Sequence, residues 1–124
     1  MNDKLSQKVI TSLFQIPEDF RSELEKLAVA TETSAPKVSI NTCIVNALEE
    51  YLNQPLDSQL KPVLPKVPLR AFTVRTSSSM KQAINHCAAI WQLKSSFPIS
   101  MNAVVNTAIL VYLQKNIAGY QPPF

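Results

Sequence analysis

The sequence holds few of the residues on which most enzyme and metal sites are built. Its 124 residues include one glycine, two cysteines and one histidine. A single glycine excludes a glycine-rich loop of the kind that cradles phosphates. His86 has no ligand partners at useful spacing and the chain has no C-x-x-C pair, so we expect no metal site. The sequence shows no carboxylate pair, Cys/His or Ser/His arrangement suited to catalysis, so we expect neither an enzyme nor a bound cofactor.

Long hydrophobic runs are also missing. The longest apolar stretch, residues 103–113, is interrupted by Asn106 and Thr107 and is too short to span a bilayer. The first eight residues are polar and lack the pattern of a signal peptide. We therefore expect a cytoplasmic protein without a membrane segment. Cys43 and Cys87 fall at apolar positions of helical patterns, which favours buried free thiols over a single disulfide.

Acidic residues are absent from the second half of the chain. Residues 1–57 hold all nine acids and five bases, a net charge of −4. Residues 58–124 hold seven bases and no acid, a net charge of +7. This asymmetry predicts that the second half faces a polyanion, with chance and solubility as the alternative explanation.

The two halves repeat each other. Residues 38–52 match residues 99–113 at an offset of 61, with five identities: Ser39/Ser100, Asn41/Asn102, Ala47/Ala108, Tyr51/Tyr112 and Leu52/Leu113. Upstream, the apolar residues Phe20, Leu24, Leu27 and Ala28 match Met80, Ile84, Cys87 and Ala88 at an offset of 60. Both sets have the i, i+4, i+7, i+8 spacing of one helix face. Further upstream, residues 11–16 and 71–76 alternate in the manner of a strand.

Each repeat therefore predicts a strand followed by two helices. In the first unit, residues 9–53, the strand spans residues 9–16 and the helices span residues 17–31 and 39–53, the second capped by Ser39. In the second unit, residues 69–116, the strand spans residues 69–76. Its helices run from a serine cap region at 77–79 to residue 93, and from Ser100 to residue 116. Residues 54–68 contain four prolines and predict an extended, semi-rigid linker. The tail, residues 117–124, is expected to be frayed or to pack as an irregular cap.

One such unit cannot bury itself, because its strand has no ladder partner and its two helices form half a core. Two copies in one chain solve both problems. We expect a mostly α fold with a two-stranded antiparallel ribbon, a single domain built as a pseudo-dimer. One face of the ribbon would lie on the helices, and the other would face outward with dimensions that fit the major groove of B-DNA.

This pattern resembles the ribbon-helix-helix (Arc/MetJ-like) family of DNA-binding proteins. The resemblance covers residues 9–53 and 69–115. It rests on the strand ending in Phe14-Gln15-Ile16-Pro17, on the amphipathic first helix and on the Ser-x-Asn start of the second helix in both repeats. Most members are homodimers of one unit, whereas this chain carries both units in tandem, as do TraY and the T-DNA overdrive-binding protein.

The resemblance implies a set of DNA contacts. Alternate outward strand residues read base edges in the family; here these are Thr11, Leu13, Gln15, Ala71, Thr73 and Arg75. The start of the second helix grips phosphate through backbone N–H groups, which implies contacts at Lys37, Ser39, Ile40, Asn41, Lys94, Ser100, Met101 and Asn102. The alternative for Gln15 and Arg75 is a plain solvent-facing strand residue, and for Ser39 and Ser100 a plain helix cap.

Two functions of different classes follow. The first is a sequence-preferring double-stranded DNA-binding protein, either a transcriptional repressor or an accessory factor of a plasmid or mobile element, such as a conjugation system. The second is a protein-interaction module, antitoxin-like or an assembly subunit, that keeps the fold without binding DNA. The last helix is apolar on all sides, so it is either the central helix or a surface for self-association with another copy. An unknown protein partner is the remaining alternative.

Overall fold

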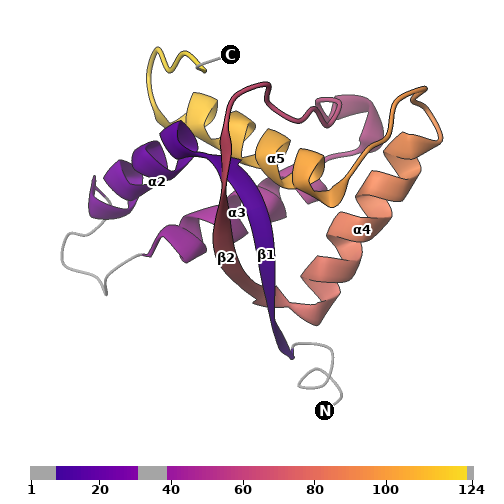
Figure 1. Ribbon diagram of the computed structural model, residues 1–124, viewed down its shortest axis with the longest axis horizontal. Helices are drawn as coiled ribbons and strands as arrows, with labels where there is room; N and C mark the ends of the chain where they lie inside the picture. Colours follow the sequence, from indigo (N-terminus) through magenta and orange to yellow (C-terminus); the bar gives the residue numbers. More distant parts are fainter. Residues whose placement is uncertain (1–7, 31–38, 123–124) are drawn as a thin grey trace.

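The computed structural model describes residues 8–30 and 39–122, which form a small ribbon and four helices (Figure 1). In chain order, the elements are β1 (Val9–Pro17), α2 (Glu18–Ala30), α3 (Ile40–Leu52), the short 3-10 helix η1 (Leu56–Ser58), β2 (Leu69–Ser77), α4 (Ser78–Gln92) and α5 (Met101–Asn116). This order confirms the expected mostly α fold with a two-stranded antiparallel sheet.

The ribbon forms by antiparallel pairing of β1 with β2, from Val9–Ser77 at one end to Pro17–Leu69 at the other. Burial alternates along both strands. Side chains at even positions face the helices, and these are buried except at the strand ends and at the half-buried Phe72: Ser12, Phe14, Ile16, Val74 and Thr76. The odd positions from Val9 to Gln15 and from Ala71 to Arg75 face away from the core, whereas Pro17 at the end of β1 is buried. In the view of Figure 1, the two strands pass in front of α3 and α5.

The helices begin and end where local chemistry places their termini. Glu18 and Asp19 occupy the first turn of α2, where the helix dipole favours acids. Side-chain caps hold the other three N-termini, because Ser39, Ser77 and Ser100 each accept a hydrogen bond from the N–H three residues later. The predicted boundaries agree to within two residues, with Pro17 ending β1 rather than opening α2.

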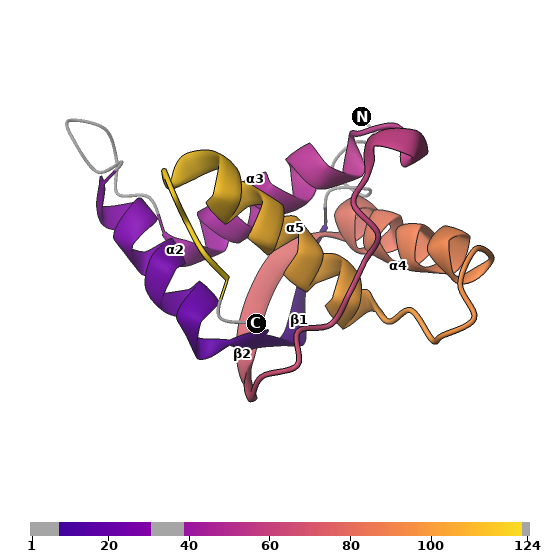
Figure 2. The same cartoon turned by 90° about the horizontal axis from the view of Figure 1, so that it is seen from above.

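Helix α5 is the centre of the core. It packs against α2, α3, α4 and β1. Figure 2 shows it running through the middle of the molecule, with α2 on one side and α4 on the other. A run of consecutive residues from Ala103 to Ile109 is buried, together with Leu113. The structure therefore shows that this apolar helix is the central helix of the core, which was one of the two alternatives expected for it.

The linker and the tail are both attached to the helices. Thr107 of α5 accepts a hydrogen bond from the Val63 N–H at 2.8 Å, and the Tyr51 hydroxyl donates to the Leu60 carbonyl. The side chain of Gln59 accepts a hydrogen bond from the Trp91 indole N–H at 2.9 Å. In the tail, Tyr120 packs on the core and its hydroxyl donates to Asp19. The described tail residues thus form the irregular cap that was one of the two expectations.

Both cysteines are buried free thiols, as expected. Within residues 8–30 and 39–122, no helix is long and apolar enough to cross a membrane.

The stability of the fold should fall at alkaline pH. Burial raises the pKa of the Cys43 and Cys87 thiols and of the Tyr51, Tyr112 and Tyr120 hydroxyls above their ordinary values of 9.0 and 10.0. The folded state therefore keeps these protons to a higher pH than the unfolded state does. The stability that they contribute is complete below the unfolded pKa and is lost as the pH rises through the folded pKa. We expect the free energy of unfolding in urea to be level up to about pH 8 and to decline from about pH 9 upward.

The Tyr51→Phe variant is the control for this prediction. It loses the hydrogen bond to Leu60 and one titrating group, so it should be less stable at neutral pH but decline less steeply. A free energy of unfolding that is unchanged or rises up to about pH 11 would contradict the expected sign.

Candidate nucleic-acid interface

The outward face of the ribbon gathers the six residues that were expected to meet base edges. They form three alternate cross-strand pairs of the register: Thr11–Arg75, Leu13–Thr73 and Gln15–Ala71. Five of the six are exposed and Gln15 is partly exposed. Leu13, at the centre, is 64% exposed. The structure thus brings these side chains onto one accessible surface, which we call the ribbon face.

Arg75 is the cation of the ribbon face. Its guanidinium makes no ion pair with any residue of the described ranges. By contrast, Arg70 of the same strand pairs with Glu18 at 3.3 Å. Lys81 of α4 donates to the Ser12 hydroxyl on the helix side of the ribbon at 2.8 Å. The exposed guanidinium of Arg75 can therefore approach an acceptor from outside, in the fork geometry that suits guanine or phosphate.

The N-termini of α3 and α5 lie against opposite edges of the ribbon. Asn41, in the first turn of α3, pairs with the backbone of Arg75 in β2: the Arg75 N–H donates to Asn41 Oδ1 at 2.7 Å, and Asn41 Nδ2 donates to the Arg75 carbonyl at 3.0 Å. Asn102, in the first turn of α5, accepts the N–H of Gln15 in β1 at 3.1 Å. Asn106 Nδ2 donates to the Gln15 carbonyl at 2.8 Å.

These asparagine clamps have a structural reason. A two-stranded ribbon has two open edges, and the peptide groups there need partners. An asparagine amide carries an NH2 donor group and a carbonyl acceptor, so Asn41 alone can replace a neighbouring strand at Arg75. At Gln15, Asn102 supplies the acceptor and Asn106 the donor. Each clamp also ties a helix N-terminus to a ribbon-face residue, which fixes the relative position of the two groups expected to touch DNA.

These hydrogen bonds change which groups at the starts of α3 and α5 are expected to contact phosphate. The side chains of Asn41 and Asn102 bond to the ribbon, so at these positions we expect a phosphate to meet the backbone N–H. The amides of Ile40 and Met101 stand at the first helical positions, before the first hydrogen bond of either helix. Ser39 and Ser100 are exposed caps whose hydroxyls accept a helix N–H at 3.1 Å.

The two lysines expected near phosphate have different outcomes. Lys37 lies outside the described residues. Lys94 is exposed in the loop after α4, at the end of that helix opposite to β2 (Figure 1). The sequence analysis also missed the role of Asn106. A polar residue inside an apolar helix indicates a hydrogen bond, but the sequence does not identify its partner.

Across 8–30 and 39–122, no group of three His, Cys, Asp or Glu side chains is placed to hold a metal ion. Comparisons with protein-family models, with curated proteins and with solved structures gave no match.

The clamps predict a local weakness. Replacing Asn41 with Ala leaves the Arg75 N–H and carbonyl without their partner, so the free energy of unfolding should fall by about 1–3 kcal/mol. Amide hydrogen exchange at Arg75 should accelerate, because its N–H then meets water. Urea titration and exchange measured by NMR check both effects.

Asn85→Ala is the matched control, because Asn85 is exposed on α4. Its effect should stay within about 0.5 kcal/mol. An Asn41→Ala variant that exchanges the Arg75 amide at the original rate would show that the clamp does not hold the ribbon edge.

Proposed function

We propose that this chain is a DNA-binding protein of tandem ribbon-helix-helix type, which inserts its ribbon face into the major groove of double-stranded DNA. The ribbon face supports this proposal: its three cross-strand pairs are exposed, with Gln15 partly so, and Arg75 makes no ion pair within residues 8–30 and 39–122. A two-stranded ribbon has the width to enter the major groove, where each base pair presents a distinct pattern of donors and acceptors.

The register of the ribbon supports the tandem arrangement. Leu13 pairs with Thr73, and these two residues occupy the same position in the two sequence repeats, at an offset of 60. The pairs on either side, Thr11–Arg75 and Gln15–Ala71, are equivalent to each other when the two repeats are exchanged. The hydrogen bond between Asn41 and Arg75 is likewise equivalent to that between Asn102 and Gln15. A pseudo-twofold axis through the Leu13–Thr73 pair accounts for all of these relations.

The two ends of the ribbon face differ in chemistry. Arg75 can donate two hydrogen bonds to guanine, while Gln15 at the symmetric position can pair with adenine. Thr11 and Ala71, the remaining equivalent pair, also differ in polarity. We therefore infer a DNA site whose two halves differ. Such a site serves either a transcriptional repressor or an accessory factor at a plasmid or conjugation origin.

A protein-interaction module without DNA binding is the second candidate. The exposed apolar side chains of Leu13 and Val9 favour it, because Leu13 occupies the centre of the ribbon face.

Binding to random-sequence duplex DNA separates the two. On the first proposal, the association constant falls steeply with salt, because phosphate contacts release counterions. Arg75→Ala should weaken binding by about 5- to 100-fold, the range for one good arginine contact, and Gln15→Ala by less. Fluorescence anisotropy over a salt series measures both.

Arg70→Ala is the matched control, because it removes the same charge from the same strand at a side chain already paired with Glu18. It should weaken binding less than Arg75→Ala. Absence of binding at low salt would sink the DNA proposal, and equal losses at Arg70 and Arg75 would sink the assignment to the ribbon face.

A further inference from the structure

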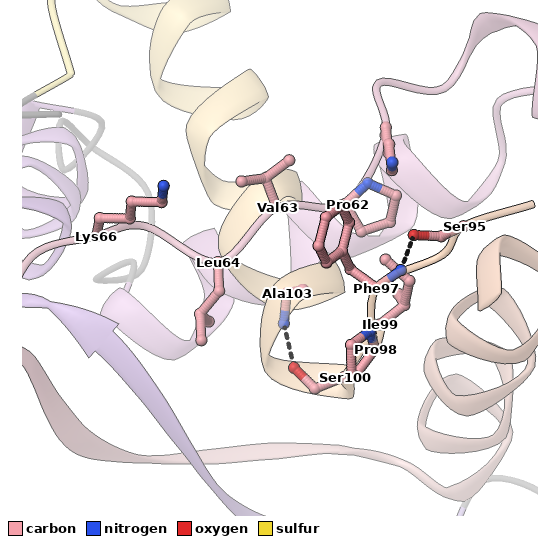
Figure 3. Close-up of a pocket in the computed structure, with 11 residues that line it drawn as sticks. Pro62, Val63, Leu64, Lys66, Ser95, Phe97, Pro98, Ile99, Ser100 and Ala103 are labelled. Carbon is pink, nitrogen blue, oxygen red and sulfur yellow. Dashed lines mark hydrogen bonds between the residues drawn. The ribbon is translucent and has the colours of Figure 1, made fainter.

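A groove of about 560 Å³ lies away from the ribbon face, between the linker and the loop that leads into α5 (Figure 3). Lys61, Pro62, Val63, Leu64 and Lys66 of the linker form one wall. The other wall is formed by the loop residues Ser95 and Phe97 to Ser100, with Ala103 of α5.

The groove exposes large apolar side chains to solvent. Phe97 is 71% exposed, Val63 57% and Leu64 40%. Isolated exposed apolar residues are ordinary on protein surfaces, but three that line one groove are typical of a binding surface.

Both walls are held by polar side chains, so this exposure is not that of a loose loop. On the linker side, Thr107 bonds to both the N–H and the carbonyl of Val63, at 2.8 and 3.3 Å. On the loop side, the amide of Gln92 donates to the Phe97 carbonyl at 3.1 Å and accepts the Ile99 N–H at 2.6 Å. A groove with pinned walls loses little conformational entropy when it is filled.

The positive charge of the groove indicates which kind of ligand it fits. Lys61 and Lys66 line it, and residues 58–124, which supply every lining residue, contain no acid. A ligand with carboxylates beside apolar groups therefore complements it. DNA does not, because phosphates would leave Phe97, Val63 and Leu64 without apolar contact.

We propose that this groove binds a short segment of another protein, one that places one or two apolar side chains between Lys61 and Lys66 and flanks them with aspartate or glutamate. None of its lining residues belongs to the ribbon face, although Ser100, the cap of α5, lines the groove beside the helix start proposed to contact phosphate. Peptide binding at the groove does not itself require DNA.

Selection from a random peptide library displayed on phage tests the proposal with the full chain as bait. We expect the enriched peptides to combine apolar residues with aspartate or glutamate. Synthetic copies, measured by fluorescence anisotropy, should bind at least 10-fold more weakly to Phe97→Ser and to Leu64→Ser. The double variant Lys61→Gln, Lys66→Gln should weaken binding at least 3-fold and flatten its salt dependence.

The loop offers matched controls outside the groove. Leu93 is 84% exposed and Lys94 is exposed, and neither lines the groove. Leu93→Ser and Lys94→Gln should therefore leave peptide affinity within twofold of the wild type. Thermal unfolding of each variant verifies that the fold is intact, which is expected because none of the replaced side chains belongs to the hydrophobic core.

Several results would overturn the proposal. These are a library without enrichment, enriched peptides lacking acids, or peptides that bind Phe97→Ser as tightly as the wild type. Self-association in sedimentation velocity that disappears in Phe97→Ser would assign the groove to a second copy of the chain. A loss of duplex DNA binding in Phe97→Ser matching that of peptide binding would assign it to nucleic acid.

Discussion

The pairing of β1 with β2 is the constraint on which the rest of the structure depends. These are the two strands of the described sheet, so each supplies the other's ladder partner. Their even-numbered side chains close the core from one side, while their odd-numbered side chains form the ribbon face. Because side chains alternate with a period of two, a slip of one residue would bury Arg75 and expose Val74. One register therefore determines both the core and the proposed contacts with DNA.

The connection between the two strands explains why α5 is apolar on all sides. The chain must return from α3 to the start of β2, and residues 54–68 do so along a path fastened to α3, α4 and α5. Helix α5 packs against three helices and β1, and it also holds the linker. Its buried polar residues each serve a neighbour: Asn106 bonds to β1, and Thr107 bonds to the linker. The contact with the linker also builds one wall of the groove.

Much of this fold could be predicted from the sequence, because its main signals are periodic and occur twice. The alternation from Thr11 to Ile16 identified which strand residues face outward, and the serine caps marked three of the four helix starts. The asparagine clamps could not be predicted, because they depend on the α3 start lying at the edge of β2, a tertiary contact. The groove was missed for the same reason: Val63 and Phe97 lie far apart in the sequence, and the fold places them on the two walls of one groove.

We propose that the ribbon face and the two helix N-termini meet DNA together. NMR chemical-shift mapping of the full chain, titrated with a short duplex, tests this proposal. We expect the largest shifts at Thr11, Gln15, Thr73 and Arg75 and at the backbone amides of Ile40 and Met101, with the exposed face of α4 unchanged. Shifts confined to α4 or to the groove around Phe97, with the ribbon face unaffected, would contradict it.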